Sequence, residues 1–114
     1  MTLKVLLASA TLALALIPSQ SKSADTFSYL GMGQYSCGAW IKDRREKSIL
    51  AALYQQWIVG FLSGVASVGP QLGISPLENT DTDGVWAWID NYCETHPLDK
   101  IIDAGQAFVR THPR

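Results

Sequence analysis

The residues of this chain best suited to covalent or redox chemistry are two cysteines, Cys37 and Cys93, and two histidines, His96 and His112. A zinc site would need further ligands, and no Cys-x-x-Cys pair is present to supply them. A catalytic triad would need a nucleophile, a histidine and a carboxylate in a recognisable arrangement, but neither histidine lies in such a motif. We therefore predict a protein that is not an enzyme, with no catalytic residue, no metal site and no cofactor.

Acidic residues are numerous in the C-terminal half, where a pair of carboxylates could in principle support glycoside hydrolysis. Their positions on polar helix faces favour an ordinary solubilising surface. Asp81 and Asp83, followed by Gly84, are similar to the start of a calcium loop, but residues 85–89 contain none of the later acidic ligands. A helix N-cap explains the two aspartates better. The acidic set comprises Glu78, Asp81, Asp83, Asp90, Glu94, Asp99 and Asp103.

A run of charged residues, 42–47, contains four bases and two acids. Because the signs alternate, a solvated helix face explains this run without a ligand. A contact with a partner protein is the alternative. The chain has no basic stripe with interleaved aromatic residues, so we predict no binding to nucleic acid.

The N-terminus has the pattern of an export signal. Lys4 precedes an apolar run over residues 5–17, and Pro18 then breaks the helix. The run is shorter than the roughly 20 residues that cross a bilayer, and small residues at Ser21 and Ser23 favour cleavage before Ala24. We predict a signal peptide at residues 1–23 and no membrane span after cleavage; a retained membrane anchor is the alternative.

Cleavage would leave one domain, residues 24–114, with seven basic and ten acidic side chains and a net charge of -3. A core of this size stabilises a fold only modestly. Exported proteins meet an oxidising compartment, so we predict a disulfide between Cys37 and Cys93. Closing so long a loop would stabilise the fold by about 4 kcal/mol.

The expected fold class is all-α, with three or four helices and no strand. Residues 24–36 are expected to form an irregular arm, and residues 37–114 the helical domain. Ser36 is a suitable N-cap for a first helix from Cys37; whether residues 42–47 continue or break that helix stays open. A central helix is expected over residues 48–68, followed by a loop over residues 69–80. Its expected buried stripe is Leu50, Leu53, Trp57, Phe61, Gly64, Val65 and Val68.

Two further helices complete the prediction. One begins near Asp81, ends at His96 before Pro97, and turns Asp90 and Glu94 toward water. The last follows Pro97, with an apolar stripe of Leu98, Ile101, Ile102, Gly105, Phe108 and Val109. In the central helix Gly60 and Gly64 share a face, so we expect another helix to pack closely there.

Four aromatic residues are candidate contacts with another protein: Trp57, Phe61, Trp86 and Trp88. Trp86 and Trp88 are two positions apart on a helix and cannot share a face, so at least one is expected near the surface. An exposed tryptophan is a common anchor in protein interfaces. A partly exposed residue at the rim of the core is the alternative.

These features resemble the HdeA/HdeB family of small periplasmic acid-stress chaperones. The similar residues are Cys37 at the start of a short helix, Trp57 with residues 60–63 in the central helix, residues 79–81, and residues 92–97 with the pattern Tyr-Cys-x-x-x-Pro. The resemblance implies a periplasmic protein that binds other, unfolding proteins through apolar surface in acid. The chain differs from the family in its aromatic N-terminal arm and in its longer, glycine-containing central helix.

A second family is similar in ground plan. Periplasmic immunity proteins that neutralise secreted cell-wall amidases also have a glycine-rich central helix and a Cys-x-x-x-Pro segment before the last helix. Many of them carry a second disulfide that this chain lacks. The alternative function is therefore to bind and block one specific effector. Neither resemblance predicts an oligomeric state.

Overall fold

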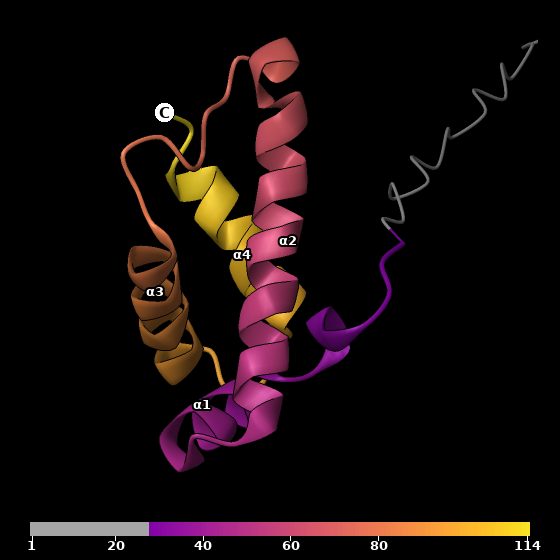
Figure 1. Cartoon of the computed structure of the whole chain (residues 1–114), viewed down its shortest axis with the longest axis vertical. Coiled ribbons are helices and arrows are strands. Elements are labelled where there is room, and N and C mark those ends of the chain that lie inside the picture. Colours follow the sequence, from indigo (N-terminus) through magenta and orange to yellow (C-terminus); the bar gives the residue numbers. More distant parts are fainter. Residues whose placement is uncertain (1–27) are drawn as a thin grey trace, which may run out of the picture.

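The computed structural model describes residues 28–114 as four α-helices, one short 3-10 helix and one disulfide, without a β-strand (Figure 1). The elements are η1 (Met32–Gln34), α1 (Cys37–Glu46), α2 (Ile49–Leu72), α3 (Thr82–Thr95) and α4 (Ile101–Thr111). The predicted all-α class with three or four helices is confirmed. The predicted signal peptide and residues 24–27 of the arm lie outside the described residues.

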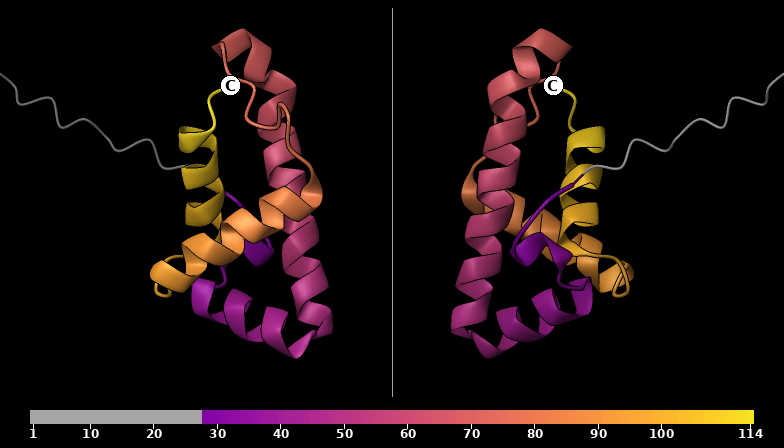
Figure 2. Two further views of the ribbon diagram at one scale, coloured as in Figure 1. Left: turned by 90° about the vertical axis from the view of Figure 1, so that its left-hand side faces the viewer. Right: turned by 90° about the vertical axis from the view of Figure 1, so that its right-hand side faces the viewer.

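Helix α2 is the longest element, and the other helices are arranged along and across it. Helix α4 runs beside α2, and α1 lies across the lower end of α2. Helix α3 crosses obliquely between α1 and α4 (Figures 1 and 2). The core lies where the four helices meet. Its largest fully buried side chains include Trp40, Tyr54, Ile58, Ile89 and Phe108.

The start of α1 is capped from two directions. The Ser36 side chain accepts a hydrogen bond from the Ala39 amide at 3.1 Å, as the N-cap prediction requires. The two amides before Ala39 are satisfied from the loop before α4. The Cys37 amide donates to the Asp99 carbonyl at 2.7 Å, and the Gly38 amide donates to the Pro97 carbonyl at 2.9 Å. The helix terminus and the loop before α4 therefore satisfy each other's backbone groups.

The charged run at residues 42–47 continues α1 rather than breaking it. The helix extends to Glu46 and stops at Lys47, which takes a left-handed conformation with φ 51°. Two residues later α2 begins. The charged run therefore belongs to the first helix as far as Glu46, and a sharp turn at Lys47 separates it from α2.

Helix α4 begins later than predicted. Residues 97–100 form a turn, and Leu98, expected in the buried stripe, is 94% exposed. The reason lies in the α1 cap, because the carbonyls of Pro97 and Asp99 bind α1 amides and are unavailable for a helix of their own. The rest of the predicted stripe is correct: Ile101, Ile102, Gly105 and Phe108 are buried and Val109 is partly buried.

Helix α2 runs one turn further than predicted, through Pro70 to Leu72. Gly73, with φ 69°, ends it: the Gly73 amide donates to the Pro70 carbonyl and the Ile74 amide donates to the Gly69 carbonyl. This is the Schellman arrangement, which satisfies the last carbonyls of a helix. Proline therefore costs one backbone hydrogen bond inside the helix, and the closing turn follows it directly.

The predicted buried face of α2 was wrong. Ala51, Tyr54, Ile58 and Leu62 are buried, whereas Leu50, Leu53, Gly64 and Val68 of the predicted stripe are exposed, and Trp57, Phe61 and Val65 are partly buried. Residues 49–72 contain no charged side chain, so apolar residues lie all around the helix. A periodic pattern then indicates a helix without indicating which side enters the core.

The close approach expected at Gly60 and Gly64 is also absent. A Cβ atom at either position would meet no atom within 4 Å. Close contacts occur instead at Gly105 in α4, where a Cβ would lie 2.7 Å from Ile58 Cδ1, and at Gly33, whose missing side chain leaves room for the Trp57 ring. Close packing of α2 against a glycine therefore occurs at Gly105 of α4 and at Gly33 of the arm.

Candidate functional site

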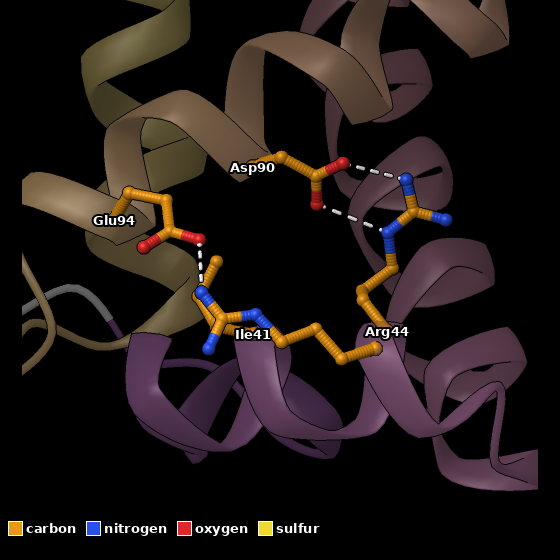
Figure 3. A pocket seen from close by; sticks show the side chains of 5 residues that line it. Ile41, Arg44, Asp90 and Glu94 are labelled. Atoms are coloured by element: carbon orange, nitrogen blue, oxygen red, sulfur yellow. Dashed lines mark hydrogen bonds and ion pairs between the residues drawn. The ribbon is translucent and has the colours of Figure 1, made fainter.

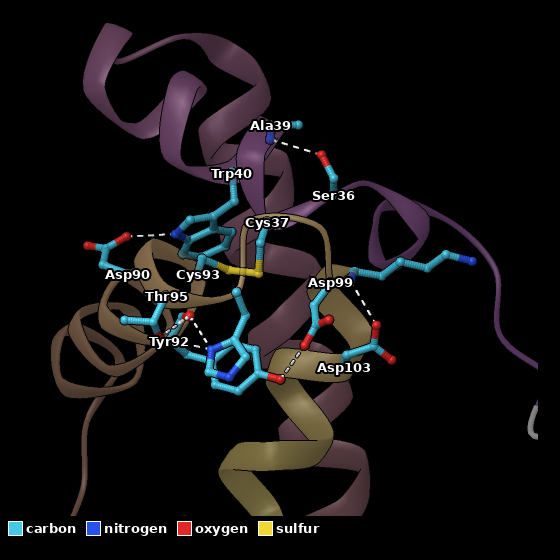
Figure 4. Close-up of a disulfide and its surroundings, with 12 residues drawn as sticks. Ser36, Cys37, Ala39, Trp40, Asp90, Tyr92, Cys93, Thr95, Asp99 and Asp103 are labelled. Carbon is cyan, nitrogen blue, oxygen red and sulfur yellow. Dashed lines mark hydrogen bonds between the residues drawn. A yellow bond between two sulfur atoms is a disulfide. The ribbon is translucent and has the colours of Figure 1, made fainter.

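The α1–α3 junction is the most tightly connected part of the described chain. Cys37, the first residue of α1, forms a disulfide with Cys93 near the end of α3, with 4.7 Å between their Cα atoms (Figure 4). Both cysteines are completely buried. The predicted pairing is confirmed, and it fixes how the two helices lie against each other.

Asp90 is the polar centre of this junction. Its carboxylate accepts a hydrogen bond from Trp40 Nε1 at 2.6 Å and two from the Arg44 guanidinium at 3.0 and 2.6 Å (Figures 3 and 4). The hydrogen bond to Asp90 raises the pKa of Arg44, against an opposing effect of burial. The prediction that Asp90 faces water was wrong: the side chain is partly buried and paired on both oxygens.

A second ion pair joins the next residue of α1, Arg45, to Glu94, which lies one turn after Asp90 on α3. Arg45 Nη2 is 2.7 Å from Glu94 Oε1, and both side chains are largely exposed, so Glu94 does face water as predicted. The two pairs and Ile41 surround an open hollow of about 290 Å³ (Figure 3). Because the charges around it are already paired, this hollow offers no unsatisfied group to a ligand.

Asp43 connects α1 to α2 from the buried side. It is 7% exposed and accepts a hydrogen bond from Ser48 Oγ at 2.9 Å. Burial, together with a hydrogen bond to Asp43, raises the pKa of the Tyr54 phenol to about 12. The turn between α1 and α2 is thus fixed by a buried carboxylate with two hydroxyl partners.

Tyr92 fixes the loop between α3 and α4. Its hydroxyl donates to Asp99 Oδ2 at 2.6 Å, and burial with this hydrogen bond raises its pKa to about 12 (Figure 4). The His96 ring stacks on Tyr92 with 4.1 Å between centroids, and His96 Nδ1 lies 2.8 Å from the Tyr92 carbonyl oxygen.

The other histidine repeats this arrangement. His112 stacks on Phe108 at 4.2 Å, and its Nδ1 lies 2.8 Å from the Phe108 carbonyl oxygen. Each histidine stands in a Thr-His-Pro sequence at the end of a helix. Both imidazoles therefore cap helix carbonyls, and the repeated tripeptide is the sequence signal for this role.

The four aromatic residues predicted to contact a partner lie on two helices, two on α2 and two on α3. All four pack against the core and are partly buried. Trp57 and Phe61 of α2 stack on each other at 5.7 Å, and the arm covers Trp57, whose Nε1 donates to the Leu30 carbonyl at 2.8 Å. Trp88 of α3 packs edge-on against Phe108. Trp86 has a buried Nε1 without a hydrogen-bond partner among residues 28–114.

The largest run of exposed apolar residues lies instead on α2. We call the exposed residues Ile49, Leu50, Leu53, Val68 and Leu72, together with Gly60 and Gly64, the outer face of α2. By length and composition α2 would suffice to cross a membrane; its most apolar stretch has a mean hydropathy of 1.5 and is 22% buried. Core helices and signal sequences can also satisfy this measure, so it identifies an apolar helix and not its surroundings.

Within residues 28–114 no group of three or more histidine, cysteine or acidic side chains is placed to hold a metal ion. No protein-family model matches the chain, and no curated protein or solved structure is significantly similar to it. Among the described residues, the candidate functional features are the cross-linked α1–α3 junction and the outer face of α2.

Sequence reasoning missed the role of Asp90, although a signal for it exists. Trp40 lies one turn after Cys37, and Asp90 lies one turn before Cys93. Once the disulfide is assigned, helices running in opposite directions bring these two positions together. The outer face of α2 had a signal too, because 24 residues without a charge exceed what one buried face needs.

Proposed function

We propose that this chain is an exported, non-catalytic protein-binding domain that acts as a periplasmic acid-stress chaperone of the HdeA/HdeB type. One observation carries the proposal: α2 has no charged residue, and its outer face exposes large aliphatic side chains in the folded domain. Ile49 is 76% exposed and Leu72 is 66% exposed. Exposed apolar surface is typical of sites that bind other proteins.

The distribution of size along this face supports contact with irregular apolar segments. Bulky side chains stand at both ends, Leu50 and Leu53 near the start and Val68 and Leu72 near the end. Gly60 and Gly64 lie between them with open space above. We infer that a face with bulky ends and a low centre would fit apolar segments of varied sequence, as a chaperone with many clients requires.

Acid changes the charge of the domain while leaving this face unchanged. In residues 24–114 the side-chain charge moves from -3 toward +9 as ten carboxylates and two histidines take up protons. Protonation removes the carboxylate partners of Arg44 and Arg45 and weakens the Asp81 cap of α3. Since α2 carries no charge, its contacts with a client would persist in acid.

The disulfide limits how far the domain can open. It joins α1 to α3 directly, so these two helices stay together when their ion pairs are lost. Helix α2 lies outside this cross-link and is held to the rest by packing, by the Asp43 hydrogen bonds and by the Trp57–Leu30 hydrogen bond, so loss of these contacts would let it swing outward. Opening would add the buried Tyr54 and Ile58 to the surface available to clients.

A second candidate is the specific binder of a secreted amidase. The observation that favours it is that the outer face of α2 is already exposed in the folded domain, where no acid is needed to uncover it. A partner with a complementary apolar surface would then bind at neutral pH. The two candidates differ in the pH at which binding occurs.

The test is suppression of client aggregation. An acid-unfolded client is followed by light scattering at about pH 2.5 and at pH 7, with and without this protein, alongside a dye that reports exposed apolar surface. Protection confined to low pH with increased dye binding supports the chaperone. Equal aggregation at both pH values with unchanged dye binding would reject it and favour the specific binder.

Matched variants identify the surface. Leu53→Lys and Val68→Lys place a charge on the outer face of α2 and should abolish protection, while stability changes by less than about 0.5 kcal/mol at such exposed positions. Asn91→Lys places the same charge on an exposed position of α3 and should leave protection intact. If all three variants protect the client equally, the outer face is not the binding surface.

A further inference from the structure

A small pocket lies where α3 begins beside the middle of α2 (Figures 1 and 2). We call it the α2–α3 pocket; its volume is about 180 Å³ and its lining is mainly apolar. It is more enclosed than the open hollow beside the Arg44–Asp90 pair. Its lining includes the buried Leu62 and Val85, the partly buried Val59 and Leu77, and the exposed Ser63 and Asp81.

The size of the pocket suits one apolar side chain. An apolar cavity of about 150 Å³ binds a benzene ring. Sites for cofactors and drug-sized ligands are larger, roughly 300–1,000 Å³. The α2–α3 pocket therefore has room for a single aromatic ring or one branched aliphatic group.

The exposed part of the pocket is negatively charged. Asp81 Oδ1 accepts a hydrogen bond from the Gly84 amide at 2.7 Å, while Oδ2 has no hydrogen-bond partner among residues 28–114. Asp83 follows two residues later, and neither carboxylate has an ion pair within the described part of the chain. No lysine or arginine occurs between Lys47 and Lys100, so no base lines this pocket. The group that complements its exposed edge is therefore a cation.

The adjoining surface of α2 leaves room for the backbone of another chain. Ser63 lies on the exposed edge of the pocket, with Gly60 one turn before it and Gly64 directly after it. A Cβ atom at either glycine would meet no atom within 4 Å. A side chain reaches the pocket only if the backbone that carries it comes close to this edge, and the two glycines permit that approach. This favours a segment of another protein over a free small molecule.

We propose that the α2–α3 pocket receives one aromatic or branched aliphatic side chain from an extended segment of a partner protein, with a lysine or arginine next to it in sequence that pairs with Asp81. The inference rests on the proposed protein-binding function and adds to it a preference for apolar side chains adjacent to a base. Unlike protection in acid, this preference requires an ionised Asp81, and so it operates at neutral pH.

The experiment uses the protein purified from the envelope after expression of the full chain, with three capped tetrapeptides as probes at pH 7. Their sequences are Ser-Phe-Arg-Ser, Ser-Ala-Arg-Ser and Ser-Phe-Glu-Ser. Binding is followed by NMR through the methyl groups of Val59, Leu62 and Val85. Loss of the ring should weaken binding about ten-fold or more, and exchange of arginine for glutamate by about two- to five-fold. Equal affinity of the first two peptides, or of the first and third, would overturn the proposal.

Matched variants locate the contacts. Ser63→Leu places a larger side chain at the edge of the pocket and should block the peptides, whereas Ser67→Leu makes the same change one turn further along α2, outside the pocket, and should not. Asp81→Asn keeps an N-cap for α3 while removing the charge, and should abolish the preference for arginine. Glu94→Gln removes one acid at the other end of α3 and should leave that preference intact. Equal binding by S63L and S67L, or equal preference in D81N and E94Q, would contradict the proposed site.

The client-protection assay at about pH 2.5 separates this proposal from the proposed function. Asp81 is then mostly protonated, so D81N should protect a client as well as the native protein does. Binding of the Phe-Arg peptide at pH 7 without protection at low pH would reject the chaperone and support the pocket. Protection at low pH, with peptide shifts at Leu53 and Val68 in place of Val59 and Val85, would support the chaperone and overturn the pocket.

Discussion

The α1–α3 junction and the outer face of α2 are built in opposite ways. At the junction a disulfide, a doubly hydrogen-bonded Arg44–Asp90 pair and a Trp40 hydrogen bond all join the same two helices. The outer face of α2 consists of exposed aliphatic residues and two glycines, without a charged group. One region holds the chain together, and the other is the surface proposed to bind a partner.

This separation explains how so small a domain can present apolar surface and remain folded. Large exposed apolar patches reduce the area that stabilises a core, and a domain of this size has little to spare. Cross-linking α1 to α3 compensates by restricting the unfolded chain. The stabilising contacts therefore lie away from the surface proposed to bind.

The largest expected effect comes from removing the disulfide. The double variant Cys37→Ser/Cys93→Ser should lose about 2–5 kcal/mol of unfolding free energy, measured by denaturant titration, because the unfolded chain gains freedom. Reduction of the native protein should lower its melting temperature likewise. An unchanged melting curve after full reduction would show that the junction is held by its polar contacts alone.

Two glycine substitutions within α2 test whether its outer face is unoccupied in the folded domain. Gly69→Ala places a Cβ 2.5 Å from the Ile74 carbonyl oxygen, whereas Gly64→Ala places one in open space. Both gain about 1 kcal/mol of helix propensity. Overpacking costs about 1–3 kcal/mol, so Gly69→Ala should be destabilising on balance and Gly64→Ala stabilising in thermal melts. Destabilisation by Gly64→Ala would mean that something already occupies the outer face.

Features determined by nearby residues could be predicted from the sequence. Ser36 and Asp81 cap their helices as predicted, and α3 ends just before Pro97. Each of these depends on one side chain and the backbone within four residues. The disulfide was also predictable, because the chain contains two cysteines and the expected export would bring them into an oxidising compartment.

Features determined by distant residues could not be predicted. The buried face of α2 depends on which side α4 and the arm occupy, and an uncharged helix carries no sign of this. The late start of α4 depends on α1, whose free amides bind the carbonyls of Pro97 and Asp99. In the candidate site, Asp90 binds Trp40 and Arg44 because the disulfide sets how α1 and α3 align. Nothing in the sequence of α3 alone indicates these contacts.

Substitutions of the two junction acids test which ion pair matters. Asp90→Asn removes the charged partner of the partly buried Arg44 and should cost about 1–3 kcal/mol at pH 7. Glu94→Gln breaks the exposed pair with Arg45 and should cost about 0–1 kcal/mol. Equal costs at pH 7 would show that the partial burial of Asp90 has no energetic consequence.

The last expected effect concerns the ionisation of Tyr92 in alkaline solution. Its pKa is raised from 10.0 to about 12 by burial and by the hydrogen bond to Asp99. A phenol with a raised pKa in the folded state stabilises the fold fully below pH 10, and this stabilisation is lost as the pH rises toward 12. Stability should therefore decline over that interval, which urea titrations at successive pH values would measure.

Tyr92→Phe separates this contribution from that of Tyr54, whose pKa is raised to about 12 as well. The variant should lose about 0.5–1.5 kcal/mol below pH 10, because the hydrogen bond to Asp99 is absent. Between pH 10 and 12 the stability of the variant should decline less steeply than that of the native protein. Of the two tyrosines with a raised pKa, only Tyr54 is then left to ionise. Equal slopes would mean that Tyr92 does not hold the loop whose carbonyls cap α1, and the junction would lose one of its supports.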